Sequence, residues 1–198
     1  MKKQIIAAAV LSTLMSGAVF AQQAQEGPWM VRVRAVNLDS ENKDRTGLGL
    51  TVNNKIIPDF DVSYFFSKNI AAELLLTTPQ KHRVSSNGTK IGTLRHLPPT
   101  LLAQYHFELP GFKPYVGAGL NYTRFSSVKL LGGAATVQKN SFGPALQVGV
   151  DIPLAPHLYL NFDIKKVYID TTVSAGGVKQ GTFNVDPLLY GVGLGWRF

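Results

Sequence analysis

The amino-acid sequence predicts an all-β protein, an eight-stranded antiparallel up-and-down transmembrane β-barrel. Three observations lead to this fold class. Eight segments alternate apolar and polar residues with the period of two that is typical of a β-strand. The connections between them are alternately short and long. Nearly all charges within the segments fall on one face, which leaves the other face free to meet lipid.

The amino terminus predicts export. Two lysines, an apolar run from Ile5 to Leu14 and small residues at Ala18 and Ala21 form the pattern of a secretory signal peptide. We expect residues 1–21 to be this signal peptide and residues 22–198 to be a single outer-membrane β-barrel. The apolar run is shorter than the roughly 20 residues that a spanning helix needs. The sequence contains no cysteine, so the exported protein cannot depend on disulfides.

The first four expected strands each separate two faces. WMVRVRAV (29–36) sets Trp, Val and Ala against Met and Arg, and DFDVSYFF (59–66) sets Phe, Val and Tyr against Asp and Ser. A short turn leads to IAAELLLTT (70–78), in which Glu73 lies on the face opposite the Ile and alternate Leu residues. TLLAQYHF (100–107) separates Leu, Ala, Tyr and Phe from Thr, Gln and His. Each pattern predicts a strand with unlike faces.

The last four strands repeat the pattern. PYVGAGLNYTRF (114–125) and ALQVGVDI (145–152) alternate large apolar residues with Gly, Asn, Gln and Asp. LYLNFDIK (158–165) sets Leu, Phe and Ile against Asn, Asp and Lys. LLYGVGLGWRF (188–198) alternates large apolar residues with glycines and an arginine. Short turns follow the second, fourth and sixth strands, whereas long polar loops follow the first, third, fifth and seventh, as in an up-and-down barrel.

The charged face is expected to point into the barrel. It carries Arg32, Arg34, Asp59, Asp61, Glu73, Asp151, Asp163, Lys165 and Arg197. These cations and carboxylates can neutralise one another in an eight-stranded interior, which is just wide enough to be filled by side chains. The opposite face holds Leu, Val, Ile, Phe, Tyr, Trp and Ala almost exclusively, as a lipid-facing surface requires. A secreted soluble barrel with its apolar face inside is the alternative.

Two groups of inward residues are candidate functional residues. With the short turns on the periplasmic side, a polar plug is expected toward that side, made of Glu73, Asp61, Asp151, Asp163, Arg197 and His106. An apolar entrance is expected toward the outer side, lined by Leu75, Leu102, Leu189, Leu48, Leu50, Leu130 and Leu131. An apolar solute can enter, but desolvation of the plug opposes straight passage. Alternatively, these leucines only pack the loops together.

Prolines point to a weak part of the wall. Pro79 closes the third strand, and Pro98 and Pro99 precede the fourth. Because proline has no backbone N–H, each one removes a donor from the ladder. We predict a lateral opening toward lipid beside these three prolines. Ordinary punctuation of strand ends is the alternative.

Other chemistry finds little support. His82, His96, His106 and His157 lack the spacing of metal ligands, and His82 and His96, at the two ends of one long loop, are expected to be solvated. No nucleophile with a supporting base is recognisable, so no enzyme, catalytic residue, metal or cofactor is predicted. The formal net charge is +8, and the basic residues lie mainly in the long loops. Their expected partner is anionic lipopolysaccharide, and nucleic acid is not an expected partner.

Five stretches resemble the outer membrane protein W (OmpW) family of Gram-negative bacteria. They are HLPPTLLAQYHF (96–107), KPYVGAGLNYTRF (113–125), AAELLLTTPQKH (71–82), QVGVD (147–151) and the GWRF ending. The resemblance implies an eight-stranded outer-membrane barrel associated with the uptake of small hydrophobic molecules and their lateral release. Phe198, with Trp196 two residues before it, is similar to the ending that the barrel-assembly machinery recognises, which implies an assembly signal.

Two functions from different classes follow from these observations. The first is a narrow passive channel for small hydrophobic molecules, which enter from the extracellular mouth and leave laterally into the membrane. The second is a structural or surface-interaction barrel with a sealed interior, whose basic loops bind lipopolysaccharide or other partners.

Overall fold

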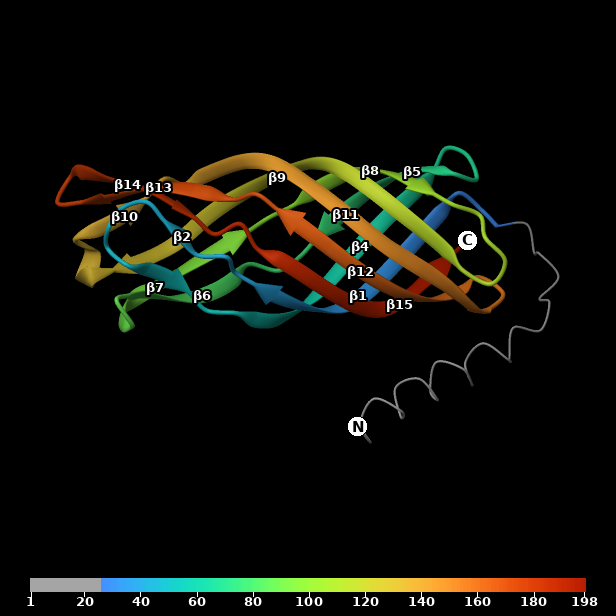
Figure 1. The fold of residues 1–198 in the computed structure, drawn as a ribbon, viewed down its shortest axis with the longest axis horizontal. Coiled ribbons are helices and arrows are strands. Elements are labelled where there is room, and N and C mark those ends of the chain that lie inside the picture. The colour runs from blue at the N-terminus through green and yellow to red at the C-terminus, as the bar shows by residue number, and fades with distance from the viewer. Residues whose placement is uncertain (1–25) are drawn as a thin grey trace, which may run out of the picture.

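The computed structural model describes residues 26–198, which form one long closed barrel (Figure 1). The predicted signal peptide lies outside the described residues. The secondary structure of the described residues is β1 (Trp29–Asp39), β2 (Lys43–Asp44), β3 (Leu50–Val52), β4 (Lys55–Phe65), β5 (Ile70–Leu76), β6 (Gln80–Ser86), β7 (Thr89–Leu97), β8 (Thr100–His106), β9 (Lys113–Leu130), the 3-10 helix η1 (Leu131–Gly133), β10 (Ala135–Val137), β11 (Asn140–Ala155), β12 (Leu158–Val167), β13 (Asp170–Ala175), β14 (Val178–Asn184) and β15 (Leu188–Arg197). None of the helical structure in this range is long and apolar enough to cross a membrane.

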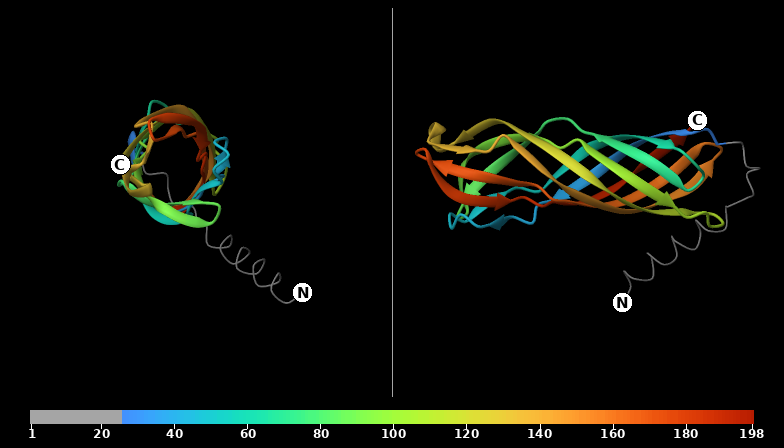
Figure 2. Two further views of the ribbon diagram at one scale, coloured as in Figure 1. Left: turned by 90° about the vertical axis from the view of Figure 1, so that its left-hand side faces the viewer. Right: turned by 90° about the horizontal axis from the view of Figure 1, so that it is seen from above.

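Eight long strands make the closed wall. Each pairs antiparallel with its neighbours in the order β1, β4, β5, β8, β9, β11, β12 and β15, and β15 returns to β1. Seen along its axis the wall is a ring (Figure 2). Closure leaves no free sheet edge in this part of the molecule, as a strand structure in lipid requires. The predicted eight-stranded barrel is therefore confirmed.

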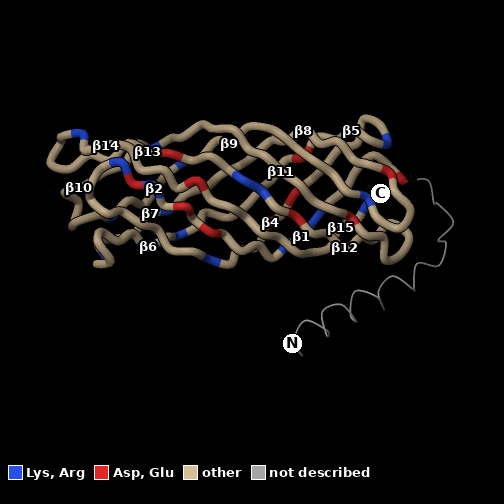
Figure 3. The backbone as a smooth tube through the Cα atoms, viewed as in Figure 1, with Lys and Arg blue, Asp and Glu red and all other residues tan. Residues whose placement is uncertain are grey.

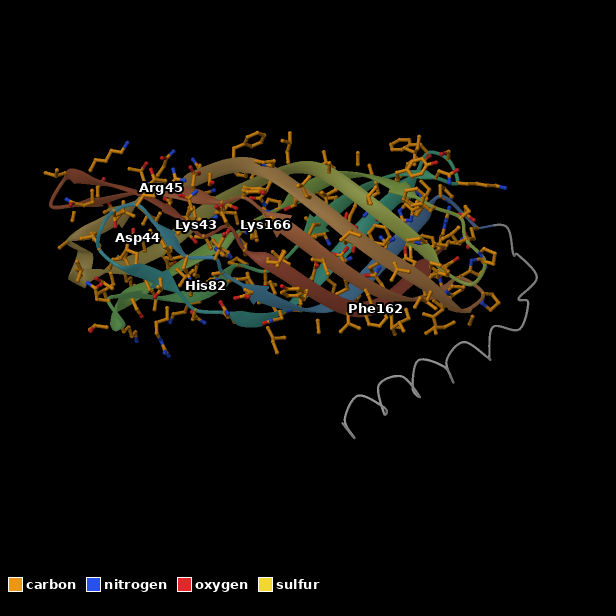
Figure 4. The ribbon with its side chains drawn as sticks, viewed as in Figure 1. Lys43, Asp44, Arg45, His82, Phe162 and Lys166 are labelled. Atoms are coloured by element: carbon orange, nitrogen blue, oxygen red, sulfur yellow. The ribbon has the colours of Figure 1, made fainter. Side chains whose placement is uncertain are left out.

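The two faces of the wall are those that the alternation predicts. On β1, Val33 is 49% exposed whereas its neighbours Arg32 and Arg34 are buried. On β15, Trp196 is 51% exposed and Arg197 is buried. Phe162 on β12 likewise points away from the barrel (Figure 4). Large apolar side chains therefore cover the outside, and the charges lie inside.

The long loops differ from the expectation. They are largely β-structure, not irregular loops, and they extend the barrel at the end remote from the carboxyl terminus (Figure 1). Their strands pair in the order β2, β14, β13, β10, β9, β7, β6 and β3. We call this part the extension. Their inward residues alternate with polar ones, so they bury an apolar face in the same way as the barrel strands do.

The interior contains two apolar clusters with charged residues between them. Along the inner face of β1, Met30 belongs to a small cluster near the termini, and Val36 and Leu38 belong to a large cluster that continues into the extension. Arg32 and Arg34 lie between these two clusters. The barrel is therefore filled along its length, with a polar layer in the middle.

Candidate functional site

The polar layer is built around Arg32. Its guanidinium donates to Asp61 Oδ1 at 3.2 Å, to Ser63 Oγ at 2.9 Å and to Asp151 Oδ2 at 2.7 Å. These partners come from β4 and β11, which lie on different sides of the ring. Arg32 is fully buried. One side chain thus ties distant parts of the wall together through charge-assisted hydrogen bonds.

Lys165 and Arg34 complete the network from β12 and β1. Lys165 Nζ lies 2.6 Å from Asp163 Oδ1 and 3.3 Å from Glu73 Oε1. Arg34 pairs with Asp61 and lies 3.3 Å from Asp59 Oδ2. The neutral side chains of Gln104, Gln147 and Tyr115 donate hydrogen bonds to further carboxylate oxygens. We call these side chains, together with Asn161, the ionic network.

The ionic network contains most of the predicted plug, and a small apolar cluster lies between it and the base. Glu73, Asp61, Asp151 and Asp163 meet in it. Because Met30 and its apolar neighbours lie beneath Arg32, the network occupies the middle of the barrel and not the periplasmic end. The network thus lies on the base side of the large apolar cluster, and Met30 with its neighbours fills the space beneath it.

Two predicted plug residues lie apart from the network centre. Arg197 is at the base, where it pairs with Glu26 at 2.7 Å and donates to Gly27 O. His106 contacts the network through Gln104 Oε1 at 3.0 Å, and its ring stacks on Tyr115. Glu26 also pairs with Lys113 at 2.8 Å. The base thus has its own ion pairs, separate from the network.

Several network residues were missing from the predicted plug. The alternation placed Arg32, Arg34 and Lys165 on the inner face. Because the carboxylates lie on the same face, these three cations could have been included in the predicted plug. The alternation places Tyr115 on the inner face with Gly117 and Asn121, but an aromatic ring alone does not indicate a bond to a carboxylate. Glu26 precedes the first strand, so no alternation includes it.

Above the network lies the large apolar cluster. It encloses a cavity of about 40 Å³, which is room for roughly one to a few water molecules. Thr171 is the one residue of its lining with a polar side chain. The lining residues come from β3, β6, β7, β9, β10, β13 and β14, from η1, and from the loop residues next to β3 and β14. We call this cavity and its lining the apolar chamber; its residues are Leu48, Leu50, Val52, Val84, Ile91, Leu94, Phe125, Leu130, Leu131, Ala135, Val137, Thr171, Val173, Ala175, Phe183 and Val185.

The predicted entrance leucines lie at different heights. Leu50 and Leu130 are buried in the chamber, whereas Leu48 and Leu131 are partly exposed at its rim. The remaining three are buried at the level of the network. Leu75 pairs with Asp61, Leu102 with Glu73, and Leu189 with Lys165. These three form the boundary between network and chamber, and four of the seven line the chamber.

The ladder of the wall is interrupted between β4 and the segment that joins β5 to β6. The β4–β5 ladder ends at the pair Phe60 and Leu76, and the β3–β6 ladder begins only at Val52 and Val84. Between them, Asn53 N donates to Arg83 O at 3.3 Å next to the β3–β6 ladder, and side chains supply the other contacts. Thr77 Oγ1 donates to Pro58 O at 3.4 Å, and Lys55 Nζ donates to Gln80 Oε1 at 3.2 Å. We call this interruption the wall break; Ile57, at the same height on β4, belongs to the apolar cluster above the network.

The three predicted prolines are not equivalent. Pro79 is exposed and follows Thr77 along the wall break. Pro98 and Pro99 also interrupt a strand, between β7 and β8. Toward β9 this segment is bonded, whereas toward Pro79 the β5–β8 ladder ends at Leu75 and Thr100 and the β6–β7 ladder begins only at Gln80 and His96. Tyr122 N donates to Pro99 O at 3.0 Å, and Asn121 Nδ2 donates to the same oxygen at 3.2 Å. Pro79 therefore borders the wall break, and all three prolines border a second interruption of the ladders, between residues 76–79 and 97–99.

His82 and His96 are buried beside each other in the extension, so the expectation of a solvated pair is wrong. Their ring centroids are 4.5 Å apart, and His82 Nδ1 lies 3.1 Å from Asn53 O. Figure 4 labels His82 in this part of the molecule. Burial lowers the pKa of His82, and burial together with the nearby His82 and Lys55 lowers the pKa of His96 to about 3. Among residues 26–198, no three metal-ligating side chains gather into a site.

Comparison with known proteins agrees with this architecture. The sequence model of the OmpW family matches residues 25–198. The chain is 35% identical over 214 residues to outer membrane protein W of Escherichia coli, which covers all of both chains. It is 39% identical over 183 residues to the uncharacterized outer-membrane protein y4mB of Sinorhizobium fredii, covering 86% of this chain and 80% of that one.

A solved structure gives the same fold. The crystal structure of the outer membrane protein OprG from Pseudomonas aeruginosa superimposes with a TM-score of 0.75 at 29% identity, over 89% of this chain and 98% of that one. The family model matches the whole described barrel, and the relative from Escherichia coli is similar over its full length. Together these two findings establish the family and the location of this chain. The chain belongs to the OmpW family and is an integral protein of the outer membrane.

Proposed function

We propose that the protein is a narrow passive channel for small hydrophobic molecules, which enter at the extracellular mouth and leave through the wall break into the membrane. The observation that carries this proposal is the vertical order of the interior. An apolar chamber has exposed leucines at its rim, lies above the ionic network and is enclosed by an apolar cluster that reaches the wall break at Ile57. An apolar solute would have to desolvate the network to continue downward.

The chemistry of the lining supports an apolar solute. Burial of apolar surface gives about 25 cal/mol per Å², whereas a polar solute would lose hydrogen bonds to water without replacement. A relative from Pseudomonas aeruginosa, 26% identical over 193 residues, is called dibenzothiophene metabolism operon protein PahQ. Dibenzothiophene is itself an apolar aromatic compound. This name is in keeping with an apolar solute for the present chain.

A structural or surface-interaction barrel with a sealed interior is the second candidate. The size of the chamber favours it, because a cavity of about 40 Å³ is smaller than any aromatic solute. Transport therefore requires the chamber to expand. The channel proposal places this expansion in the apolar contacts of the extension, which are not directional and can rearrange.

A crosslink across the wall break tests the lateral route. Continuing the register from Phe60 and Leu76 places Pro58 opposite Thr78, so Pro58→Cys with Thr78→Cys is the test pair. Val62→Cys with Leu74→Cys is the matched control, because these residues face each other on the same two strands where the ladder is intact. The chain has no cysteine of its own.

Uptake of an apolar fluorescent dye by cells is the measurement. Oxidation of the Pro58 and Thr78 pair should slow uptake, and a thiol reductant should restore it, while the control pair should take up dye at the parent rate in both states. If the crosslinked test pair passes the dye as fast as the parent, the lateral route fails. If cells with and without the parent protein take up the dye equally, the sealed barrel replaces the channel.

Two expected partners, the barrel-assembly machinery and lipopolysaccharide, are also proposals. Trp196 and Phe198 are exposed at the base, and Phe198 N and O both bond the backbone of Trp29, which closes the barrel. We expect their aromatic side chains to be the signal that the barrel-assembly machinery recognises. Deletion of Phe198 should then reduce the amount of inserted barrel without changing dye uptake per inserted molecule. The other expected partner is lipopolysaccharide, and its binding requires a defined surface on the outside of the barrel.

A further inference from the structure

One side of the extension carries seven exposed cations and no carboxylate. They are Lys81, Arg83, Lys90, Arg95, Arg124, Lys129 and Lys139. The sequence has no Asp or Glu between Glu73 and Glu108 or between Glu108 and Asp151, so the strands that hold these cations supply no partner of opposite charge. Within residues 26–198, none of the seven forms an ion pair. We call the outward surface that they form on β6, β7, β9 and the start of β11 the basic face.

The ladder brings these cations together. Lys81 is directly opposite Arg95 on the β6–β7 ladder, and Thr93 separates Arg83 from Lys129. Arg124 lies opposite Asn140, the residue after Lys139. Like charges directly opposite each other on neighbouring strands are destabilising. Folding therefore gives no reason for this arrangement, and an external anion that meets several of the cations would relieve the repulsion.

The basic face begins where the lipid-facing belt ends. On β9 the outward residues Val116, Leu120 and Tyr122 are all exposed and apolar or aromatic. Arg124 is the next outward residue after Tyr122, about 7 Å further along the strand. Aromatic residues mark the boundary between hydrocarbon and head groups in such barrels. The cations therefore stand at the height of the outer-leaflet head groups, on the same surface as the acyl-chain belt.

The opposite side of the extension is different. There Glu41 pairs with Lys43 at 2.5 Å and with Lys166 at 2.7 Å, and Asp44 and Asp186 lie on neighbouring segments. Asp170 lies at the border of the two sides, where Ser141 Oγ donates to it at 3.0 Å. Figure 3 shows basic and acidic residues next to each other around β2. The excess of positive charge is thus confined to one side, which a general preference for basic loops does not explain.

We propose that the basic face binds the phosphate groups of a phosphorylated glycolipid in the outer leaflet, lipopolysaccharide, while its acyl chains lie against the apolar belt below. Lys and Arg suit this role because each can donate several hydrogen bonds to phosphate oxygens, and Arg can do so in a bidentate manner. The site is independent of the channel, so the cysteine crosslink does not test it.

Neutralisation of the cross-strand pair tests the site. The variant is Lys81→Gln with Arg95→Gln, and the matched control is Lys179→Gln with Arg45→Gln, which removes one lysine and one arginine that are exposed and without an ion pair on the other side of the extension. The purified barrel in detergent is titrated with intact lipopolysaccharide after divalent cations are removed. Unchanged heat-modifiable mobility on a gel shows that both variants fold.

The test pair should bind intact lipopolysaccharide about tenfold or more weakly than the parent, and the control pair should bind as the parent does. Parent protein should bind phosphatase-treated lipopolysaccharide as weakly as the test pair binds the intact lipid. Equal losses in test and control pairs, or full parental binding to the dephosphorylated lipid, would overturn the proposal. Competition by inorganic phosphate beyond that of chloride at equal ionic strength would also overturn it, because the site would then recognise a small free anion.

Discussion

Between Met30 and Val36 the interior of the barrel is ionic, and from Val36 outward a large apolar cluster fills it. In the lower region each contact has a fixed direction, because Arg32 and Lys165 must aim several donors at particular carboxylate oxygens. In the apolar chamber the contacts have no preferred direction. The network can therefore hold the membrane-spanning wall in one shape, while the chamber can change its packing at little cost. For the proposed channel, we therefore expect opening in the extension and not in the base.

The comparison predicts that the largest loss of stability follows removal of a network cation. Arg32→Met leaves buried Asp151 without a cationic partner and leaves buried Asp61 with Arg34 alone. Breaking a buried ion pair costs about 3 to 5 kcal/mol, so we expect that loss in the free energy of unfolding, measured with urea in lipid vesicles.

Arg83→Met is the control for the change of residue type. Arg83 is exposed on the basic face and forms no ion pair among the described residues. We expect its loss to stay within about 0.5 kcal/mol. Equal stability of the Arg32 and Arg83 variants would mean that the network fills space without holding the wall.

A smaller loss is expected on the outer surface of the wall. Val192 is 45% exposed in the lipid-facing belt of β15, and Val178 is 64% exposed on β14 in the extension. Val192→Arg should destabilise the barrel by about 2 to 4 kcal/mol, because arginine near the membrane centre must be desolvated. Val178→Arg, measured by the same urea titration, should be almost neutral because water surrounds it. Equal tolerance would contradict the position of the membrane boundary.

Alternation made the wall and its faces predictable from sequence. The period of two in segments such as LLYGVGLGWRF fixes which side chains point outward, and a closed barrel is the way to satisfy eight such strands in lipid. The ionic network was predictable as a set of inward charges. The small apolar cluster beneath it was not, because Met30 and Tyr159, which fill the base, read as ordinary strand residues.

The extension was harder to predict because its strands are short and polar outside. Lys81, Arg83 and Arg95 made the second long loop appear solvated, although His82, Val84 and Leu94 alternate with them toward the interior. Proline gave a similarly incomplete signal. The sequence shows that Pro79 and Pro99 lack a donor, but only the strand pairing shows that Tyr122 closes the wall between Pro99 and β9 and that nothing comparable bonds Pro79 among the described residues.

A third prediction concerns pH and the buried histidines of the extension. Burial lowers the pKa of His96 in the folded protein to about 3, below its ordinary value near 6.5, and nearby Lys55 and His82 act in the same direction. The unfolded extension therefore binds a proton more readily than the folded one. Stability is complete above pH 6.5 and falls as the pH drops below it, by about 1 to 2 kcal/mol at pH 5.

Hydrogen exchange at the β6–β7 hairpin measures this effect. After correction for the intrinsic dependence of exchange on pH, protection in the parent should fall between pH 7 and pH 5. His96→Phe keeps an aromatic ring beside Phe125 and removes the titrating group, so its protection should change much less. The barrel strands β1 and β15 serve as an internal reference. An equal fall in parent and variant would assign the pH dependence to another group.

The smallest effect is expected where ion pairs are exposed. Glu41 accepts from both Lys43 and Lys166, and these contacts lower its pKa to about 2. Water surrounds all three side chains, however, so it screens the charges and can replace the lost hydrogen bonds. Lys166 also donates to Asp186 O, and Glu41 N donates to Val185 O, and both bonds survive when the carboxylate is neutralised. Glu41→Gln should therefore leave the urea midpoint unchanged, whereas Asp61→Asn, which removes the same charge inside the network, should lower it. If the two substitutions lowered the midpoint equally, the number of ion pairs, and not their burial, would determine the stability of this barrel.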